Sequence, residues 1–454
     1  MAAANVSIRG TQLHVDGSFN PRWGDGNYPR LSKVLHDAEI FSVRLFQVNF
    51  SCLDQAFVTL LGTVLKSRVW DRIYLAYCSG TMPDSCLKGC LLTKQLEVYG
   101  PTLNLLPILG HALTKVTSPI ECLRLRTRLQ QDDVIPVIEG LKASVGLKKL
   151  YLTCAFADEE SAVLLSTGLA ENRHLQLLSL YSCEMENEVS MERILSALRY
   201  HPTITTLEIR DNNASGITAL SLLVQHTTTL ENLDLYLPPV TIQQVQVPRL
   251  NLETFSEALR ENTSIKSLAL ANNGLRCPDI LHLILALQRN KTLQRLNLQG
   301  NLISDEGIQA LARSLPHMSL KELCLWNNPF TATGAEALLG GLRHPATTLQ
   351  AITTFSRYPC TADILYCTHL NRAGRGLLYR QACCDDIDVN SSMEMEDDNR
   401  EDYNDDVTLE RSKVPIALWA TILGRVNEQR WSSAESASVI YTLLKEGPVV
   451  VESR

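Results

Sequence analysis

The sequence predicts an α/β solenoid: a horseshoe-shaped stack of repeats with a parallel sheet on its concave face and helices on its convex face. One observation is a short apolar pattern that recurs at intervals near 28 residues. A second is that a segment with helical spacing follows many of the copies. A third is length, because 454 residues exceed one compact globule unless the architecture is elongated.

The apolar pattern is clearest in the stretch LQRLNLQGNLI, residues 293–303, whose spacing fits neither a plain strand nor a helix. Strong copies start at 175, 204, 265 and 320, and weaker ones at the remaining positions. The twelve predicted repeats start at residues 43, 70, 93, 120, 147, 175, 204, 230, 265, 293, 320 and 349.

Each repeat predicts a short strand, a turn and a helix. Leu296 and Leu298 would point into the core from one strand, and the turn after them would bury backbone groups that need partners. The amide of Asn301 can bond to such groups, so stacked repeats would form an asparagine ladder, with Cys78 and Cys183 as substitutes. The following segment, SDEGIQALARSL, has helical spacing with Ser304 as its cap.

This pattern resembles the leucine-rich repeat, L-x-x-L-x-L-x-x-N/C-x-L, in its long ribonuclease-inhibitor-like form, over about residues 40–360. The resemblance implies strands on the concave face, helices on the convex face and a protein-binding role. Two intervals depart from the pattern, and the first is the repeat that starts at 70, which is only 23 residues long. The repeat that starts at 230 is 35 residues long, so we expect a loop insertion at TIQQVQVPRLNL.

The chain divides into five predicted segments. We expect an N-terminal cap at 1–42, with a hairpin around Gly10, and about twelve repeats at 43–360. A C-terminal cap helix at 361–380 would place Ile364, Leu365 and Leu370 on one face and break at Gly374. An acidic disordered linker at 381–410 and a helical hairpin at 411–454, expected to dock on the cap, complete the chain.

Charge and composition indicate the class of protein. The formal net charge is -7, and residues 385–410 alone hold twelve acidic residues and one basic residue. The sequence shows no apolar run long enough to span a membrane and no leader, so we expect a soluble monomer of the cytoplasm, with the nucleus as the alternative. The thirteen cysteines include Cys86 with Cys90 and Cys383 with Cys384, but no second pair stands at zinc spacing.

Candidate chemistry is sparse. No phosphate-binding, dinucleotide, metalloprotease or esterase motif is present. The acidic pairs at 132–133 and 159–160 fall in the first turns of predicted helices, where they complement the helix dipole. We therefore expect no catalytic, cofactor-binding or metal-binding residues and no enzymatic activity. Basic residues form no stripe, so we do not expect nucleic acid as a partner.

The predicted binding site is the concave face. Five of the thirteen tyrosines fall among its 36 outward strand positions, and tyrosine, tryptophan and arginine dominate interface energetics. A preference of aromatic residues for strands is the competing explanation. The candidate partner-binding residues are Tyr99, Arg126, Tyr151, Tyr181, Arg210, Tyr236 and Trp326. Four of these residues, Tyr181, Arg210, Tyr236 and Trp326, are expected to form one continuous patch.

The leading hypothesis is a non-enzymatic scaffold or adaptor that binds a protein partner on the concave face. The alternative is a GTPase-activating protein, because the Ran GTPase-activating family also joins long leucine-rich repeats to an acidic C-terminal stretch. A third hypothesis is an adaptor whose C-terminal hairpin recruits another protein.

Overall fold

The computed structural model describes residues 5–16, 27–37, 39–100, 104–127, 131–153, 159–183, 188–210, 217–237, 240–242, 245–247, 250–344, 346–353 and 358–372. The chain forms two compact units that divide after Leu237. The predicted break at Gly374, the acidic linker and the C-terminal hairpin lie outside the described residues.

The first unit alternates strands and helices. Its strands are β1 (Asn5–Arg9), β2 (Gln12–Asp16), β3 (Ser42–Phe46), β4 (Trp70–Ala76), β5 (Thr93–Tyr99), β6 (Cys122–Arg126), β7 (Lys149–Thr153), β8 (Leu177–Tyr181), β9 (Thr206–Arg210) and β10 (Asn232–Tyr236). Its helices are α1 (Asn27–His36), η1 (Phe50–Cys52), α2 (Gln55–Lys66), α3 (Asp84–Cys90), α4 (Leu105–Leu113), α5 (Gln131–Ala143), α6 (Glu159–Glu171), α7 (Glu188–Leu198) and α8 (Ile217–His226).

The second unit continues the same alternation. Its strands are β11 (Val240–Ile242), β12 (Val245–Val247), β13 (Ser267–Ala269), β14 (Arg295–Asn297), β15 (Glu322–Cys324) and β16 (Ala351–Thr353). Its helices are α9 (Leu252–Glu261), α10 (Cys277–Arg289), α11 (Asp305–Ser314), η2 (Leu315–His317), α12 (Ala332–Arg343) and α13 (Thr361–Arg372). None of the described helices is long and apolar enough to cross a membrane.

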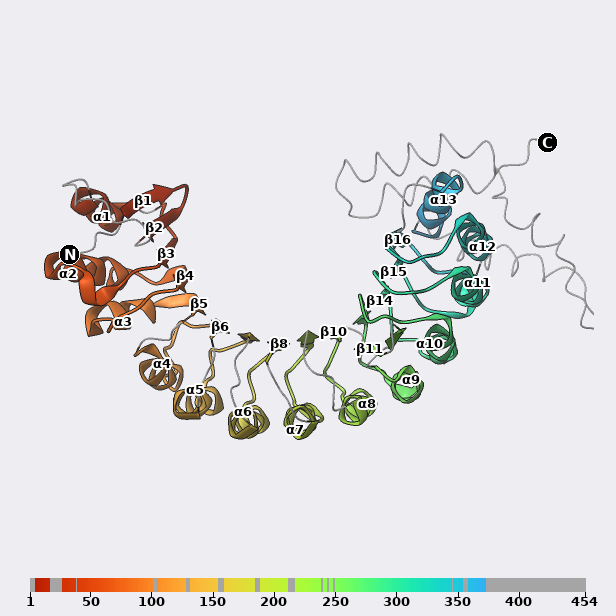
Figure 1. The fold of residues 1–454 in the computed structure, drawn as a ribbon, viewed down its shortest axis with the longest axis horizontal. Helices are drawn as coiled ribbons and strands as arrows, with labels where there is room; N and C mark the ends of the chain where they lie inside the picture. Colours follow the sequence, from red (N-terminus) through yellow and green to blue (C-terminus); the bar gives the residue numbers. More distant parts are fainter. Residues whose placement is uncertain are drawn as a thin grey trace, which may run out of the picture. The chain divides into compact units, whose positions relative to one another are not determined.

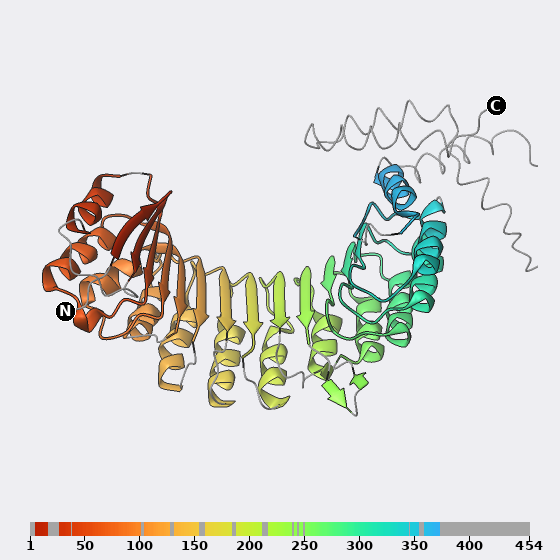
Figure 2. The ribbon, with the colours of Figure 1, turned by 45° about the horizontal axis from the view of Figure 1, so that its top comes forward.

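The predicted α/β solenoid is confirmed in both units. In the first, β1 and β2 pair as an antiparallel hairpin, and β2 to β10 then pair in parallel in chain order. In the second, β13 to β16 are parallel. Within each unit the strands of the parallel sheet lie on one side and the helices on the other, and β2 to β10 run side by side in one direction (Figures 1 and 2).

The apolar pattern forms the core between sheet and helices. In the stretch from which the pattern was defined, Leu293, Leu296, Leu298 and Ile303 are each at most 2% exposed. Burying a leucine side chain is worth about 1.5–3 kcal/mol, so the recurrence of this pattern, rather than helix propensity, stabilises the stack.

The asparagine ladder is present as predicted. The side-chain oxygen of Asn301 accepts from the backbone N–H of Asn273 (3.0 Å) and Leu275 (3.1 Å), both in the preceding repeat. Its amide nitrogen donates to the carbonyls of Leu270 (2.9 Å) and Leu298 (2.8 Å). Each such side chain therefore joins two neighbouring repeats and satisfies backbone groups that water cannot reach.

Thiols replace the amide at the weaker positions of this ladder. The Sγ of Cys78 donates to the Leu45 carbonyl at 3.6 Å, and that of Cys183 donates to the Leu152 carbonyl at 3.4 Å. A thiol is a weak donor and offers little to the N–H groups that an asparagine oxygen serves. These repeats keep the link to the previous strand but lose part of the hydrogen bonding.

A second ladder, which the repeat pattern did not predict, runs along the ends of the helices. Asn172 donates to the Leu141 carbonyl at 2.7 Å, and Asn290 donates to the Leu259 carbonyl at 2.6 Å. His201 takes the same position, three residues before its repeat start, and its Nδ1 accepts from the backbone N–H of Ile204 (3.2 Å). His201 is only 3% exposed, although it lies just beyond the end of α7.

The predicted start of the first repeat is wrong by three residues. Val43 pairs with Ile73, which is the third residue after Trp70, so the repeat begins at Ile40 rather than at Val43. Both starts fit the apolar spacing, because Phe46 and Val48 mimic the next apolar pair. Pairing between strands decides between them.

Three smaller expectations also need correction. The insertion after β10 contains a two-stranded antiparallel hairpin, β11 with β12, rather than a plain loop. Ser304 occupies the cap position of α11 without a side-chain capping bond, and its hydroxyl instead lies 3.0 Å from the Cys277 thiol. On α13, Ile364 and Leu370 are buried but Leu365 is exposed, because consecutive residues of a helix point about 100° apart and Leu365 follows directly after Ile364.

Candidate functional site

The candidate site is the strand face of the first unit, meaning the side chains that leave its sheet on the side away from the helices. Alternation along each strand and parallel pairing align these side chains in rows that cross the sheet, with neighbours in a row about 4.8 Å apart. The central row runs from β3 to β10 as Arg44, Tyr74, Glu97, Arg124, Tyr151, Ser179, Glu208 and Asp234. The end row runs as Phe46, Ala76, Tyr99, Arg126, Thr153, Tyr181, Arg210 and Tyr236.

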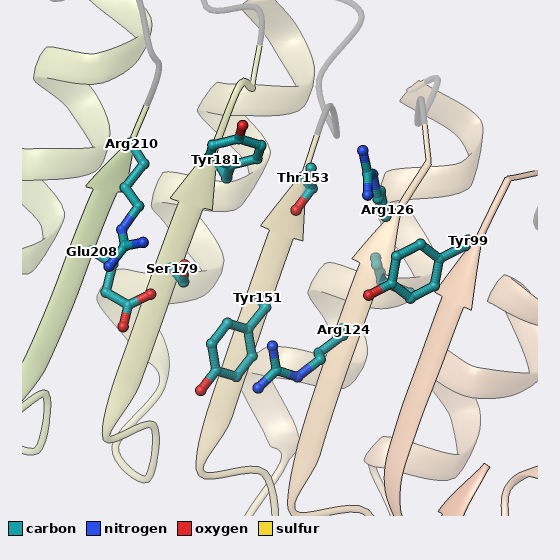
Figure 3. Close-up of a pocket in the computed structure, with 10 residues that line it drawn as sticks. Tyr99, Arg124, Arg126, Tyr151, Thr153, Ser179, Tyr181, Glu208 and Arg210 are labelled. Atoms are coloured by element: carbon teal, nitrogen blue, oxygen red, sulfur yellow. The ribbon is translucent and has the colours of Figure 1, made fainter. Parts of the chain in front are cut away.

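A pocket of about 220 Å³ lies on this face, and five of the seven predicted residues line it (Figure 3). They are Tyr99, Arg126, Tyr151, Tyr181 and Arg210. They come from five successive strands, β5 to β9, which the sequence separates by more than 100 residues. The fold therefore gathers most of the predicted residues around one concavity.

The other two predicted residues lie elsewhere. Tyr236 is in register with Arg210 on the adjacent strand, just beyond the pocket, and Arg210 is in register with Tyr181. Trp326 belongs to the second unit, where its side chain is 44% exposed. The continuous patch that we predicted holds for Tyr181, Arg210 and Tyr236, while the inclusion of Trp326 stays a prediction.

Arginine and tyrosine side chains stack on one another across this face. The guanidinium carbon of Arg124 lies 3.6 Å from the centre of the Tyr151 ring, and that of Arg126 lies 5.8 Å from the Tyr99 ring. Such cation–π contacts are worth about 0.5–2 kcal/mol. Burial raises the pKa of Tyr151, which stays protonated and can donate its hydroxyl to a ligand.

Glu97 organises the arginines, although the repeat pattern did not single it out. Its side chain is buried, and its carboxylate accepts a 2.7 Å hydrogen bond from Arg72 and lies 3.4 Å from the Nε of Arg124. The hydrogen bond to Glu97 raises the pKa of Arg72. A lone acidic residue at an outward strand position, with Arg124 in register on β6 and Arg72 two residues before the aligned Tyr74 on β4, was the signal that could have revealed it.

The first repeat also contributes side chains to this face, and these follow from its start at Ile40 rather than at Val43. The wrong start would have placed Leu45 there, but Leu45 is buried and Arg44 and Phe46 point outward. The guanidinium of Arg44 lies 4.9 Å from the Tyr74 ring centre, and Tyr74 lies 5.0 Å from Tyr99. The stacking thus extends from β3 through β7.

At the other end of the pocket, Arg210 forms an ion pair with Asp234 on the next strand. Glu208 also lines the pocket, together with the hydroxyl groups of Thr153 and Ser179. This end offers carboxylates and small hydrogen-bonding groups rather than stacked arginines.

The second unit presents a different strand face. Its hollow of about 280 Å³ is lined mainly by small side chains, with Arg295 and Glu322 as the charged exceptions. It lacks the stacked arginine and tyrosine side chains of the first unit among its described strands. The predicted partner-binding residues therefore concentrate on the first unit.

No chemistry beyond binding is evident in the described part of the chain. No group of three or more His, Cys, Asp or Glu side chains is placed to hold a metal ion there. Cys86 and Cys90 are both buried, and burial raises the pKa of Cys86 to about 11. A thiol with such a pKa is protonated and a poor nucleophile.

Comparison with known proteins points to one repeat family. A family model described as Leucine Rich repeat matches residues 289–312. A Protein phosphatase 1 regulatory subunit 37 homolog of Caenorhabditis elegans is 24% identical over 287 residues, which are 61% of this chain and 28% of that protein. NACHT, LRR and PYD domains-containing protein 14 of Homo sapiens is 26% identical over 338 residues, 71% of this chain and 30% of that protein.

The chain thus spans less than a third of the length of these two curated relatives. Among solved structures, the actin-binding site 2 of leiomodin-1 matches 29% of this chain and 80% of that chain, with 25% identity and a TM-score of 0.26.

Proposed function

Because this chain is a leucine-rich-repeat protein, we propose that it is a non-enzymatic scaffold whose first unit binds a protein partner on its strand face. A protein-interaction role in general is also indicated by the relatives, one of which is named as a regulatory subunit homolog. The choice of the strand face, expected to be the concave one, rests on the side chains gathered there.

The observation that carries the proposal is the pocket shared by five of the predicted residues. Tyr181 is 39% exposed at its rim, although large apolar and aromatic side chains are more stable when covered. Tyrosine and arginine are the residues most often found at the energetic centre of protein interfaces.

The stacking favours binding in a second way. Arg124 is fixed between Glu97 and the Tyr151 ring, so little of its side-chain freedom remains to be lost when a partner binds. Ordering a long side chain at an interface costs about 0.5–1.5 kcal/mol, and a preorganised face avoids much of that cost.

The experiment compares proteins captured by the wild-type chain with those captured by two single variants. Tyr181→Ala removes an exposed ring from the strand face. Tyr200→Ala removes an exposed ring that follows α7 and contacts His226 at the end of α8. A partner of the strand face should be lost with the first variant and kept with the second. The purified partner should bind the Tyr181→Ala variant at least about fivefold more weakly than it binds the wild-type chain.

The proposal fails if every captured protein survives Tyr181→Ala and Arg126→Ala while changes on the helices release them. The GTPase-activating alternative would instead show as faster GTP hydrolysis by a small GTPase in the presence of the chain, which we do not expect.

A further inference from the structure

Charge is unevenly distributed over the strand face of the first unit. From β3 to β7 the outward side chains include five cations and one carboxylate, which are Arg44, Arg72, Arg124, Arg126, Lys149 and Glu97. From β8 to β10 they include one cation and two carboxylates, Arg210, Glu208 and Asp234. The pocket lies across the boundary between these two regions.

Arg126 is the available cation at the positive end. Its side chain is exposed and contacts the Tyr99 ring; within the described residues it forms no ion pair. Its neighbour Arg124 shares the single carboxylate of Glu97 with Arg72, so two guanidiniums face one negative charge. An acidic group that approaches Arg126 would complete the pairing that the fold leaves unfilled.

Glu208 is the available carboxylate at the negative end. The guanidinium of Arg210, two residues further along β9, is engaged by Asp234 on the next strand. Among the described side chains, none forms an ion pair with Glu208, which is half-buried in the wall of the pocket. A basic group would find its partner there.

We propose that this pocket binds a peptide segment of a partner that carries an acidic side chain for Arg126 and a basic side chain for Glu208. The apolar or aromatic residues between them would lie against Tyr151 and Tyr181. Arg126 is on β6 and Glu208 on β9, three strands apart, and Glu208 stands two residues before Arg210, which is in register with Arg126. The two charges of the segment should therefore stand about 16 Å apart. This inference rests on the proposed function and adds the charge pattern and the orientation of the partner.

The two ends together distinguish a protein segment from a polyanion. A nucleic acid or an acidic lipid surface would gain from Arg126 but would be repelled by Glu208 and Asp234. A segment with both charges pairs with Arg126 at one end and with Glu208 at the other. If the same segment bound in the reverse direction, its basic side chain would face Arg126 and its acidic side chain would face Glu208.

The test uses a phage-displayed library of random 12-residue peptides selected on the full chain. Enriched peptides should carry one acidic and one basic residue about five positions apart if extended, or about eleven if helical. Peptides selected on the Arg126→Gln variant should lose the acidic residue and keep the basic one. Peptides selected on the Glu208→Gln variant should lose the basic residue and keep the acidic one. Both side chains are at least partly exposed, so circular dichroism should show that these variants fold.

A charge exchange then tests the contact directly. The best peptide should bind each glutamine variant about threefold more weakly at low salt, and the difference should shrink at high salt. The peptide with lysine in place of its acidic residue should bind Arg126→Glu better than it binds the wild type.

The outcomes separate the inference from the function on which it rests. Selected peptides that depend on Tyr181 but ignore both glutamine variants would overturn the charge pattern alone. Uniformly acidic peptides, together with a single-stranded RNA that competes with them, would overturn it in favour of a polyanion. Peptides that ignore Tyr181→Ala as well would overturn the strand face as the binding surface.

Discussion

The guanidinium carbon of Arg124 lies 3.6 Å from the centre of the Tyr151 ring, while its Nε lies 3.4 Å from the Glu97 carboxylate. A carboxylate on one strand thus positions an arginine on the next strand against an aromatic ring on a third. The candidate site is a preorganised network across β5, β6 and β7, and its parts should respond together to substitution.

Glu97→Gln should loosen this network. The amide keeps the shape of the side chain but removes the charge that holds Arg72 and Arg124, so we expect a loss of about 1 kcal/mol in the free energy of unfolding. Denaturant titration measures it. Glu322→Gln is the control, because Glu322 is exposed on the second unit and should change stability by less than about 0.5 kcal/mol. Equal effects of the two variants would contradict the role of Glu97.

Substitutions at Asn301 should rank by hydrogen-bonding capacity. Asn301→Ala leaves two backbone N–H groups without their acceptor and removes two donated bonds, so we expect a loss of about 3 kcal/mol. Asn301→Cys should be intermediate, because a thiol can still donate, as Cys78 does in its own repeat. Denaturant unfolding of the two variants tests this order, and a cysteine variant no better than alanine would refute it.

His201 should make the first unit sensitive to acid. Burial lowers its pKa from 6.5 to about 4, so the folded protein binds this proton less readily than the unfolded chain. The stability contributed by neutral His201 is therefore present above pH 6.5 and lost as the pH falls from 6.5 towards 4, by up to about 3 kcal/mol. Thermal melts across this range measure the loss.

His201→Asn supplies the matched comparison for that pH series. Asparagine already stands at the equivalent position of two other repeats, as Asn172 and Asn290, and it does not titrate. The variant should therefore keep its stability between pH 6.5 and 4 better than the wild type. Parallel pH curves for the two proteins would show that other groups cause the loss.

Two glycine substitutions should act in opposite directions. Gly300 has a φ of 67°, and a Cβ there would stand 1.9 Å from the side-chain oxygen of Asn272, so Gly300→Ala should cost about 1–3 kcal/mol. Gly340 lies in α12, where an added methyl group would meet nothing within 4 Å, so Gly340→Ala should stabilise by about 0.5–1 kcal/mol. Melting temperatures that move in the same direction would contradict this explanation.

The repeat pattern predicted the fold well, because leucines such as Leu296 and Leu298 are spaced as the strand requires and nothing else explains their recurrence. It misplaced the first start, since Ile40 and Val43 fit the spacing equally and only the pairing with β4 separates them. The helix-end ladder was missed because its position, three residues before a repeat start, holds asparagine in some repeats (Asn172 and Asn290) and histidine in another (His201).

The site was predictable in its residues but not in its contacts. Strand alternation alone places Tyr99, Tyr151 and Tyr181 on one face, and the structure adds that a single pocket joins them. The partnership of Glu97 with Arg124 depends on register between strands 27 residues apart, which a sequence pattern read one repeat at a time does not reveal.

The in-register parallel pairing of β2 to β10 also determines how the first unit would respond to a pulling force. Its hydrogen bonds between strands lie along the axis of the stack, so a load applied through the two ends of the unit would open them one strand at a time, like a zip. Each repeat released would lengthen the chain by roughly 95 Å, since an extended residue spans about 3.4 Å. The unit would then yield in regular steps at modest force rather than in one abrupt rupture.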